Sequence, residues 1–137
     1  MYFMLSWIPT LFVDSGYTRS QGIDALTGFN VGAIPGILIL AFLTTRLPLV
    51  PLLSLFFLSA GGVLVFVGLT EPSELGSLMT LMFFAGVFLH GGFTCLYALA
   101  AQVYPSDVRA AGVGWAAGLG RTGAIVSPVF AAALITA

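Results

Sequence analysis

Arg121 is the side chain whose position in this sequence most needs a chemical explanation. It lies 12 residues after Arg109, inside a glycine-rich apolar stretch. A helix of that length rises about 18 Å, which places Arg121 near the middle of a hydrocarbon core about 30 Å thick. An arginine at that depth costs on the order of 2.5 to 3.5 kcal/mol on insertion scales. It is therefore tolerated only where it faces protein or a watery cavity.

Arg121 is also suited to binding an anion. A guanidinium group can hold a carboxylate through two parallel hydrogen bonds. We therefore take Arg121 as the leading candidate for binding the carboxylate of an anionic substrate. The alternative is a structural arginine, which pairs with carbonyl groups or with a carboxylate on another helix and never touches substrate.

Three further side chains within apolar runs are candidates for substrate binding: His90, Asn30 and Trp115. Histidine changes charge near neutral pH, so His90 could accept a coupling proton, although a neutral imidazole bonded within the bundle is the favoured alternative. Asn30 could bind a substrate hydroxyl or bridge to a neighbouring helix, and bridging is favoured. Trp115, like Tyr97, could offer a surface to an aromatic ligand or simply pack against its neighbours.

The remaining charged candidates lie in turns. Arg109 follows Tyr104 and Pro105, where an apolar run has ended, and Asp107 is close enough in sequence to be its partner. Arg46 lies in the turn formed by residues 44–48. Arginines at membrane surfaces commonly fix the orientation of the chain. A role in a conformational switch is the other interpretation for these turns.

The composition places the chain in a lipid bilayer. It is 59% hydrophobic and only 7% charged, with a mean hydropathy of +1.11, whereas soluble domains carry about 25% charged residues. There is no basic patch for nucleic acid. The single cysteine, Cys95, excludes a disulfide framework and a thiolate metal cluster within the chain. No paired carboxylates, histidine cluster or Ser–His arrangement indicates an enzyme.

Five apolar segments predict an all-α, polytopic transmembrane bundle, because in lipid only helices and closed barrels satisfy the backbone. We treat residues 1–137 as one membrane domain. Glycines at four-residue spacing in the second segment predict close helix packing, and Pro35 predicts a kink. The first segment is too short to cross the membrane. The predicted helices span residues 1–13, 23–43, 49–69, 75–103 and 108–135.

The distribution of charge gives an orientation. The turns with Arg46 and Arg109 lie on one side of the membrane, and the loops with Arg19, Glu71 and Glu74 lie on the other. Two cations against one favour the Arg46 and Arg109 side as cytoplasmic.

Residues 104–128 carry the pattern Y-P-x-x-x-R-A-x-G-x-G-W-A-x-G-x-G-R-x-G-A-I-x-x-P. This pattern resembles the loop between helices 10 and 11, and helix 11 itself, of the aromatic acid:proton symporters in the major facilitator superfamily. Residues 6–11, S-W-x-P-T-L, resemble the end of helix 7, and residues 29–36, F-N-x-G-x-x-P-G, resemble helix 8. The superfamily's motif at the turn after helix 8 is degenerate here and retains only Arg46.

The resemblance implies a partial major facilitator fold, helices 7 to 11 of twelve. It implies proton-coupled symport of small aromatic acids of the benzoate type, with the proton as coupling ion and no other cofactor. The implied partners are the bilayer and an N-terminal half that carries the proton-coupling carboxylates, and the implied location is a bacterial inner membrane. By resemblance, Arg109 acts in the inward–outward switch. The alternatives are another carrier of the superfamily, for an organic ion or a sugar, and a freestanding small membrane protein.

Overall fold

The computed structural model describes residues 2–70 and 74–135, and this part of the chain is helical without strands. Its helices follow one another through short turns. Because α2 and α3 together form one apolar segment of 25 residues, Arg19–Leu43, the predicted all-α arrangement of about five segments is confirmed. The helices are α1 (Tyr2–Asp14), α2 (Arg19–Val31), α3 (Ala33–Leu43), α4 (Leu49–Thr70), α5 (Leu75–Val103) and α6 (Arg109–Ile135).

The second segment begins earlier than predicted, at Arg19 instead of residue 23. Thr18 and Gln21 form a capping box: the Gln21 amide donates to Thr18 Oγ1 at 3.3 Å, and the Thr18 amide donates to Gln21 Oε1 at 2.8 Å. These bonds satisfy two amides that a helix start leaves unpaired. Arg19 is therefore the first residue of a helix and not part of a loop. Gly16, with a φ of 86°, makes the turn before it.

The predicted kink in this segment is a break between α2 and α3 at Gly32. Pro35 has no amide hydrogen, so it cannot bond the carbonyl of Val31 four residues earlier. Val31 is the last residue of α2. The break therefore lies one turn before the proline, near the middle of the segment.

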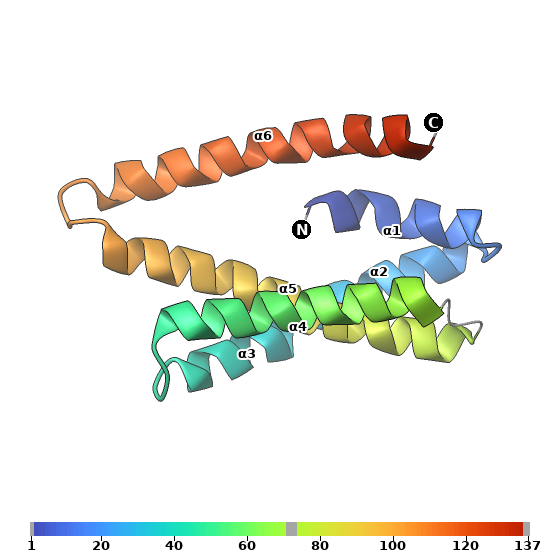
Figure 1. Ribbon diagram of the computed structural model, residues 1–137, viewed down its shortest axis with the longest axis horizontal. Helices are drawn as coiled ribbons and strands as arrows, with labels where there is room; N and C mark the ends of the chain where they lie inside the picture. The colour runs from blue at the N-terminus through green and yellow to red at the C-terminus, as the bar shows by residue number, and fades with distance from the viewer. Residues whose placement is uncertain (1, 71–73, 136–137) are drawn as a thin grey trace.

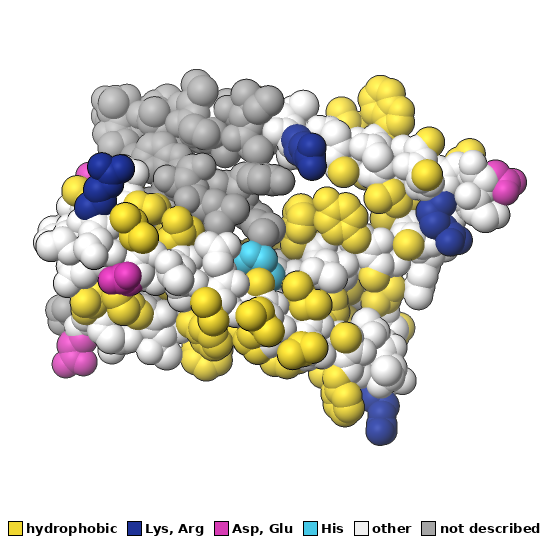
Figure 2. All heavy atoms as spheres, turned by 180° about the vertical axis from the view of Figure 1, so that it is seen from behind, with side chains coloured by type: hydrophobic (Ala, Val, Ile, Leu, Met, Phe, Trp, Pro, Cys, Tyr) yellow, Lys and Arg dark blue, Asp and Glu magenta, His cyan; other side chains and the backbone are white. Residues whose placement is uncertain are grey.

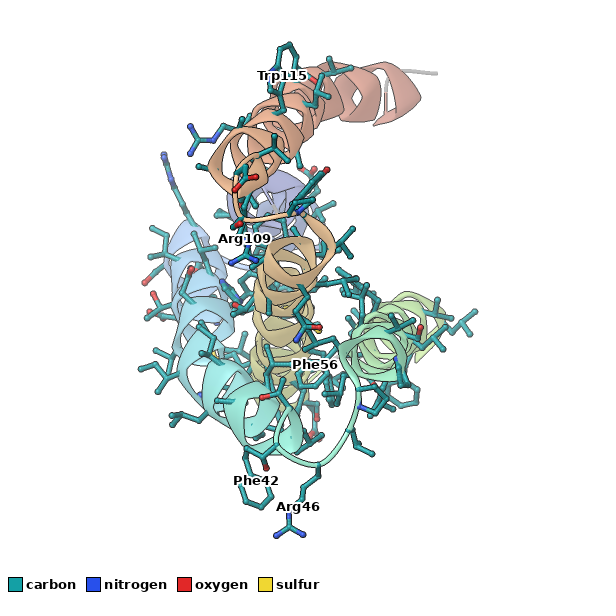
Figure 3. All side chains as sticks on the ribbon, turned by 90° about the vertical axis from the view of Figure 1, so that its left-hand side faces the viewer. Phe42, Arg46, Phe56, Arg109 and Trp115 are labelled. Carbon is teal, nitrogen blue, oxygen red and sulfur yellow. The ribbon has the colours of Figure 1, made fainter. Side chains whose placement is uncertain are left out.

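The helix α5 lies at the centre of the bundle, between α4 on one side and α2 with α3 on the other (Figure 1, Figure 3). In its most apolar stretch of 18 residues half are buried, against 22% in the corresponding stretch of Arg19–Leu43 and 17% in that of α4. Phe56 points from α4 toward α5 (Figure 3). Two hydrophobic clusters line α5: Ile8, Phe12, Ala25, Phe29, Leu78, Met82 and Ala85 in one, and Leu40, Leu49, Leu52, Phe56 and Cys95 in the other.

The broken helix crosses α5 at backbone contact. A Cβ added to Gly32 would meet the Val87 amide nitrogen at 2.9 Å, and one added to Gly86 would overlap the Phe29 carbonyl oxygen. Gly36 likewise faces the backbone of Val87. Such close approach lets dispersion forces and backbone dipoles hold membrane helices together where lipid supplies no hydrophobic drive. The predicted small-residue packing thus uses Gly32 and Gly36, whereas Gly28 has open space around it.

Three helical segments in the described residues are long and apolar enough to cross a membrane: Arg19–Leu43, Leu49–Leu69 and Leu75–Val103. Their outer faces expose large side chains such as Leu58 (76%) and Phe42 (65%), which suits contact with lipid tails. The charged side chains gather mainly at the two ends of the molecule (Figure 2). The chain is a multi-pass integral membrane protein. Glu71, used in the orientation argument, lies outside the described residues.

The helix α6 lies apart from the bundle, and among the described residues its main contacts are with α1 and α5 (Figure 1). Tyr104, the residue that follows α5, packs against the first turns of α6, and the Tyr104 ring occupies the space that a Cβ on Gly112 would need. One face of α6 and the outer face of α2 therefore meet no helix in the described structure.

Candidate functional site

Arg121 lies midway along α6, as the thirteenth of its 27 residues, and its side chain is exposed. It forms no ion pair with any residue whose position is described. A guanidinium carries five N–H donors, which suits it to a carboxylate partner. The geometry leaves Arg121 able to hold a carboxylate, and it equally leaves room for a structural partner.

A shallow groove of about 440 Å³ runs along α6 beside Trp115. Trp115 is 72% exposed and points away from the rest of the bundle (Figure 3). Six residues separate it from Arg121, which at 100° per residue sets the two side chains about 120° apart around the helix. Trp115 therefore does not share the face of Arg121. The groove is lined by Ala111, Gly114, Trp115, Gly118, Leu119 and Thr122.

His90 is buried between α5 and α2, with 9% of its surface exposed. Its Nδ1 lies 2.9 Å from the Gly86 carbonyl oxygen, and since a carbonyl only accepts, Nδ1 carries the hydrogen. Its ring packs against Phe29, with centroids 5.1 Å apart and planes at 56°. This arrangement fits a residue that fastens the α2–α5 crossing, the structural alternative from the sequence.

Asn30 lies on the exposed face of α2, with its side-chain amide donating to the Leu26 carbonyl at 2.8 Å. Thr27 and Asp24 precede it at three-residue spacing, and both are exposed. Each step of three residues turns the side chain by about 60°, so Asp24 lies about 120° from Asn30 around the helix. Sequence reasoning missed Asp24 and Thr27. The signal was there, because polar residues three apart in a membrane segment mark one face of a helix.

The turn residues are arranged differently from the prediction. Arg109 Nε donates to the Tyr104 carbonyl oxygen at 3.2 Å, and Asp107 accepts instead from the Ser106 hydroxyl at 3.0 Å. Arg109 thus bonds to the C-terminal end of α5, where a cation is favoured by the helix dipole. Figure 3 shows Arg109 beside this end of α5 and Arg46 pointing away from the bundle.

The structure places His90 at the α2–α5 crossing, against Phe29, whereas the side chain of Asn30 is exposed on the outer face of α2. It does not bring Arg121 and Trp115 onto that crossing. In the described part of the chain no group of three or more metal-ligating side chains is present. What the fold offers is two separate exposed faces, that of Arg121 on α6 and that of Asn30 on α2.

Comparison with known proteins identifies close relatives by sequence. The chain is 33% identical to the 3-(3-hydroxy-phenyl)propionate transporter of Escherichia coli over 135 residues, which are 98% of this chain and 33% of that protein. It is 33% identical to the 4-hydroxybenzoate transporter PcaK of Pseudomonas aeruginosa, covering 98% of this chain and 30% of PcaK. It is 32% identical to the gentisate transporter of Corynebacterium glutamicum, covering 98% of this chain and 30% of that transporter.

The chain therefore spans about one third of the length of these relatives. No family model matches the chain. No solved structure matches it either.

Proposed function

We propose that this chain forms part of a carrier for small aromatic carboxylic acids. The ground for the proposal is that the chain belongs to the aromatic acid:proton symporter family of the major facilitator superfamily. The substrate would be of the benzoate or hydroxybenzoate type and would enter with one or more protons. The protein would act as a carrier and not as an enzyme, with the proton as coupling ion, in a bacterial inner membrane. The remaining two thirds of such a carrier would supply the other wall of the site.

The observation that carries the proposal is an exposed arginine midway along a helix of 27 residues. Transporters of this kind bind substrate near the middle of the bilayer, between two halves that rock around it. Arg121 is thirteenth in α6, and Asn30 is twelfth in the 25-residue segment Arg19–Leu43. If both helices are centred in the bilayer, the two side chains lie at similar depth. A carboxylate at that depth needs a cation, and Arg121 provides one.

The turn between α5 and α6 supports a role in alternating access. Arg109 joins the end of α5 to the start of α6 through its bond to Tyr104. A hinge at this point would let α6 move relative to the tightly packed helices α2 to α5. We propose that Arg109 steadies this hinge, with Asp107 shaping the turn. Arg46 would contribute charge at the same membrane surface.

Competition for uptake tests the proposal. Cells expressing the transporter that contains this chain should accumulate labelled 4-hydroxybenzoate, and excess unlabelled benzoate or hydroxybenzoate should reduce that uptake. Excess glucose should not. Collapse of the proton gradient by an uncoupler should abolish accumulation. Competition by sugars, or the absence of aromatic acid uptake, would contradict the proposal.

A further inference from the structure

The outer face of α2 is polar although the helix belongs to a membrane span. Asp24, Thr27 and Asn30 are exposed within the apolar segment Arg19–Leu43, on a surface that winds about 120° around the helix. Beyond the break at Gly32 the exposed face turns apolar, with Ile34 (64%) and Leu38 (65%). The polar stripe, defined as Asp24, Thr27 and Asn30, therefore runs from near one membrane surface to about the middle of the span. Polar groups at such depths face protein or water, because lipid tails offer them no partner.

The polar stripe is not the face that α2 uses for packing against its neighbours. Toward α1, a Cβ on Gly22 would meet the Pro9 Cα at 2.9 Å. Toward α5, Gly32 lies against the backbone of Val87. Both helix contacts are thus made through glycines, which allow the backbones to come close. The polar stripe is a third face, built of larger side chains with no such close-packing pattern.

The hydrogen bonds within α2 decide what the polar stripe can offer to a ligand. The Thr27 hydroxyl donates to the Ile23 carbonyl at 2.9 Å, which uses its single hydrogen. The Asn30 amide donates to the Leu26 carbonyl at 2.8 Å. Thr27 Oγ1, Asn30 Oδ1 and the Asp24 carboxyl oxygens therefore face outward as acceptors, beside the second N–H of the Asn30 amide. Such a surface can accept the hydrogen of a hydroxyl group.

We propose that the polar stripe of α2 is the subsite for the ring hydroxyl of a hydroxylated aromatic acid, with the carboxylate held at Arg121. This inference rests on the proposed function and adds to it the place where the ring hydroxyl binds. Thr27 and Asn30 accept the hydroxyl hydrogen. Asp24 lies nearer the membrane surface, at the outer end of the polar stripe.

The test compares two substrates that differ by one hydroxyl. Uptake of 4-hydroxybenzoate and of benzoate is measured for the intact transporter and for Thr27→Val and Asn30→Leu, each normalised to its abundance in the membrane. Loss of one hydrogen bond predicts a fall of about tenfold for 4-hydroxybenzoate. Benzoate uptake should stay within about twofold, on the same grounds. Thr27→Ser keeps the hydroxyl and should restore selectivity.

Thr80→Val is the matched control. Thr80 is also an exposed threonine whose hydroxyl donates within its own helix, to the Gly76 carbonyl at 2.8 Å, but it lies on α5. It should leave the ratio of the two uptake rates unchanged. An equal loss for both acids would overturn the subsite and indicate that the polar stripe packs against another part of the protein. An unchanged ratio in both α2 variants would overturn it too. If the unmodified transporter takes up neither acid, the proposed function itself fails, and the subsite with it.

Discussion

Replacing Gly86 with alanine tests the helix crossing on which the bundle depends. The added methyl group would overlap the Phe29 carbonyl oxygen and approach the Phe29 Cα at 3.0 Å. Backbone atoms cannot rotate away, so α2 and α5 must separate. Overpacking of this kind costs about 1 to 3 kcal/mol, while alanine in place of glycine returns about 1 kcal/mol of helix propensity. Because the clash is with backbone, we take the upper figure and expect a net loss of about 2 kcal/mol.

Cys95 provides the assay. It is the only cysteine in the sequence and is fully buried beside α4, with its thiol 3.5 Å from the Leu49 carbonyl oxygen. A maleimide dye can therefore label this thiol only after the helices open. When opening and closing are fast, the labelling rate follows the population of the open state, so a loss of about 2 kcal/mol should speed labelling about 30-fold.

Gly28→Ala is the matched control, because a Cβ there meets nothing within 4 Å. It lies on the same helix segment as Gly32 and should slow labelling slightly through its gain in helix propensity. Equal labelling rates for Gly86→Ala and the unmodified protein would refute the close crossing of α2 and α5. Faster labelling in Gly28→Ala as well would show that the effect is not specific to the crossing.

Two further predictions concern the ends of helices. Arg109→Gln removes the charged group that donates to the Tyr104 carbonyl oxygen. Losing this interaction lowers the local stability by about 1 kcal/mol, so amide hydrogen exchange in the last turn of α5 should become about fivefold faster. An unchanged exchange rate in that turn would contradict the bond. Thr18→Ala removes the side-chain half of the capping box, so exchange in the first turn of α2 should also speed about fivefold, whereas Thr44→Ala, at the end of α3, should leave that turn unchanged.

Much of the architecture can be predicted from the sequence, because membrane segments are recognised by their length and apolar composition. Length and apolar content predict the helices around residues 49–69 and 75–103, which the structure places at Leu49–Thr70 and Leu75–Val103. The predicted start of α2, residue 23, was wrong because Thr18 and Gln21 are polar and suggest a loop. Only their reciprocal hydrogen bonds make them a helix cap.

Packing partners are harder to predict than segments. Glycines at four-residue spacing indicate a close contact, but the pattern cannot say that Gly32 and Gly36 make it while Gly28 does not. It also gives no hint that Gly86 is the partner on α5. For the site, Trp115 and Arg121 lie on different faces of α6. Their six-residue spacing in the sequence is enough to predict this separation. The roles of Arg121, Asn30 and His90 in binding remain predictions.

Uptake by an Arg121→Lys variant tests the central claim most directly. Lysine keeps the charge but loses the planar fork that holds a carboxylate at two points. Charged hydrogen bonds contribute about 1.5 to 3 kcal/mol, so uptake of 4-hydroxybenzoate should fall at least about tenfold at equal abundance in the membrane. Arg19→Lys, at the first residue of α2, should leave uptake unchanged. Normal uptake kinetics in Arg121→Lys would show that Arg121 does not bind the substrate.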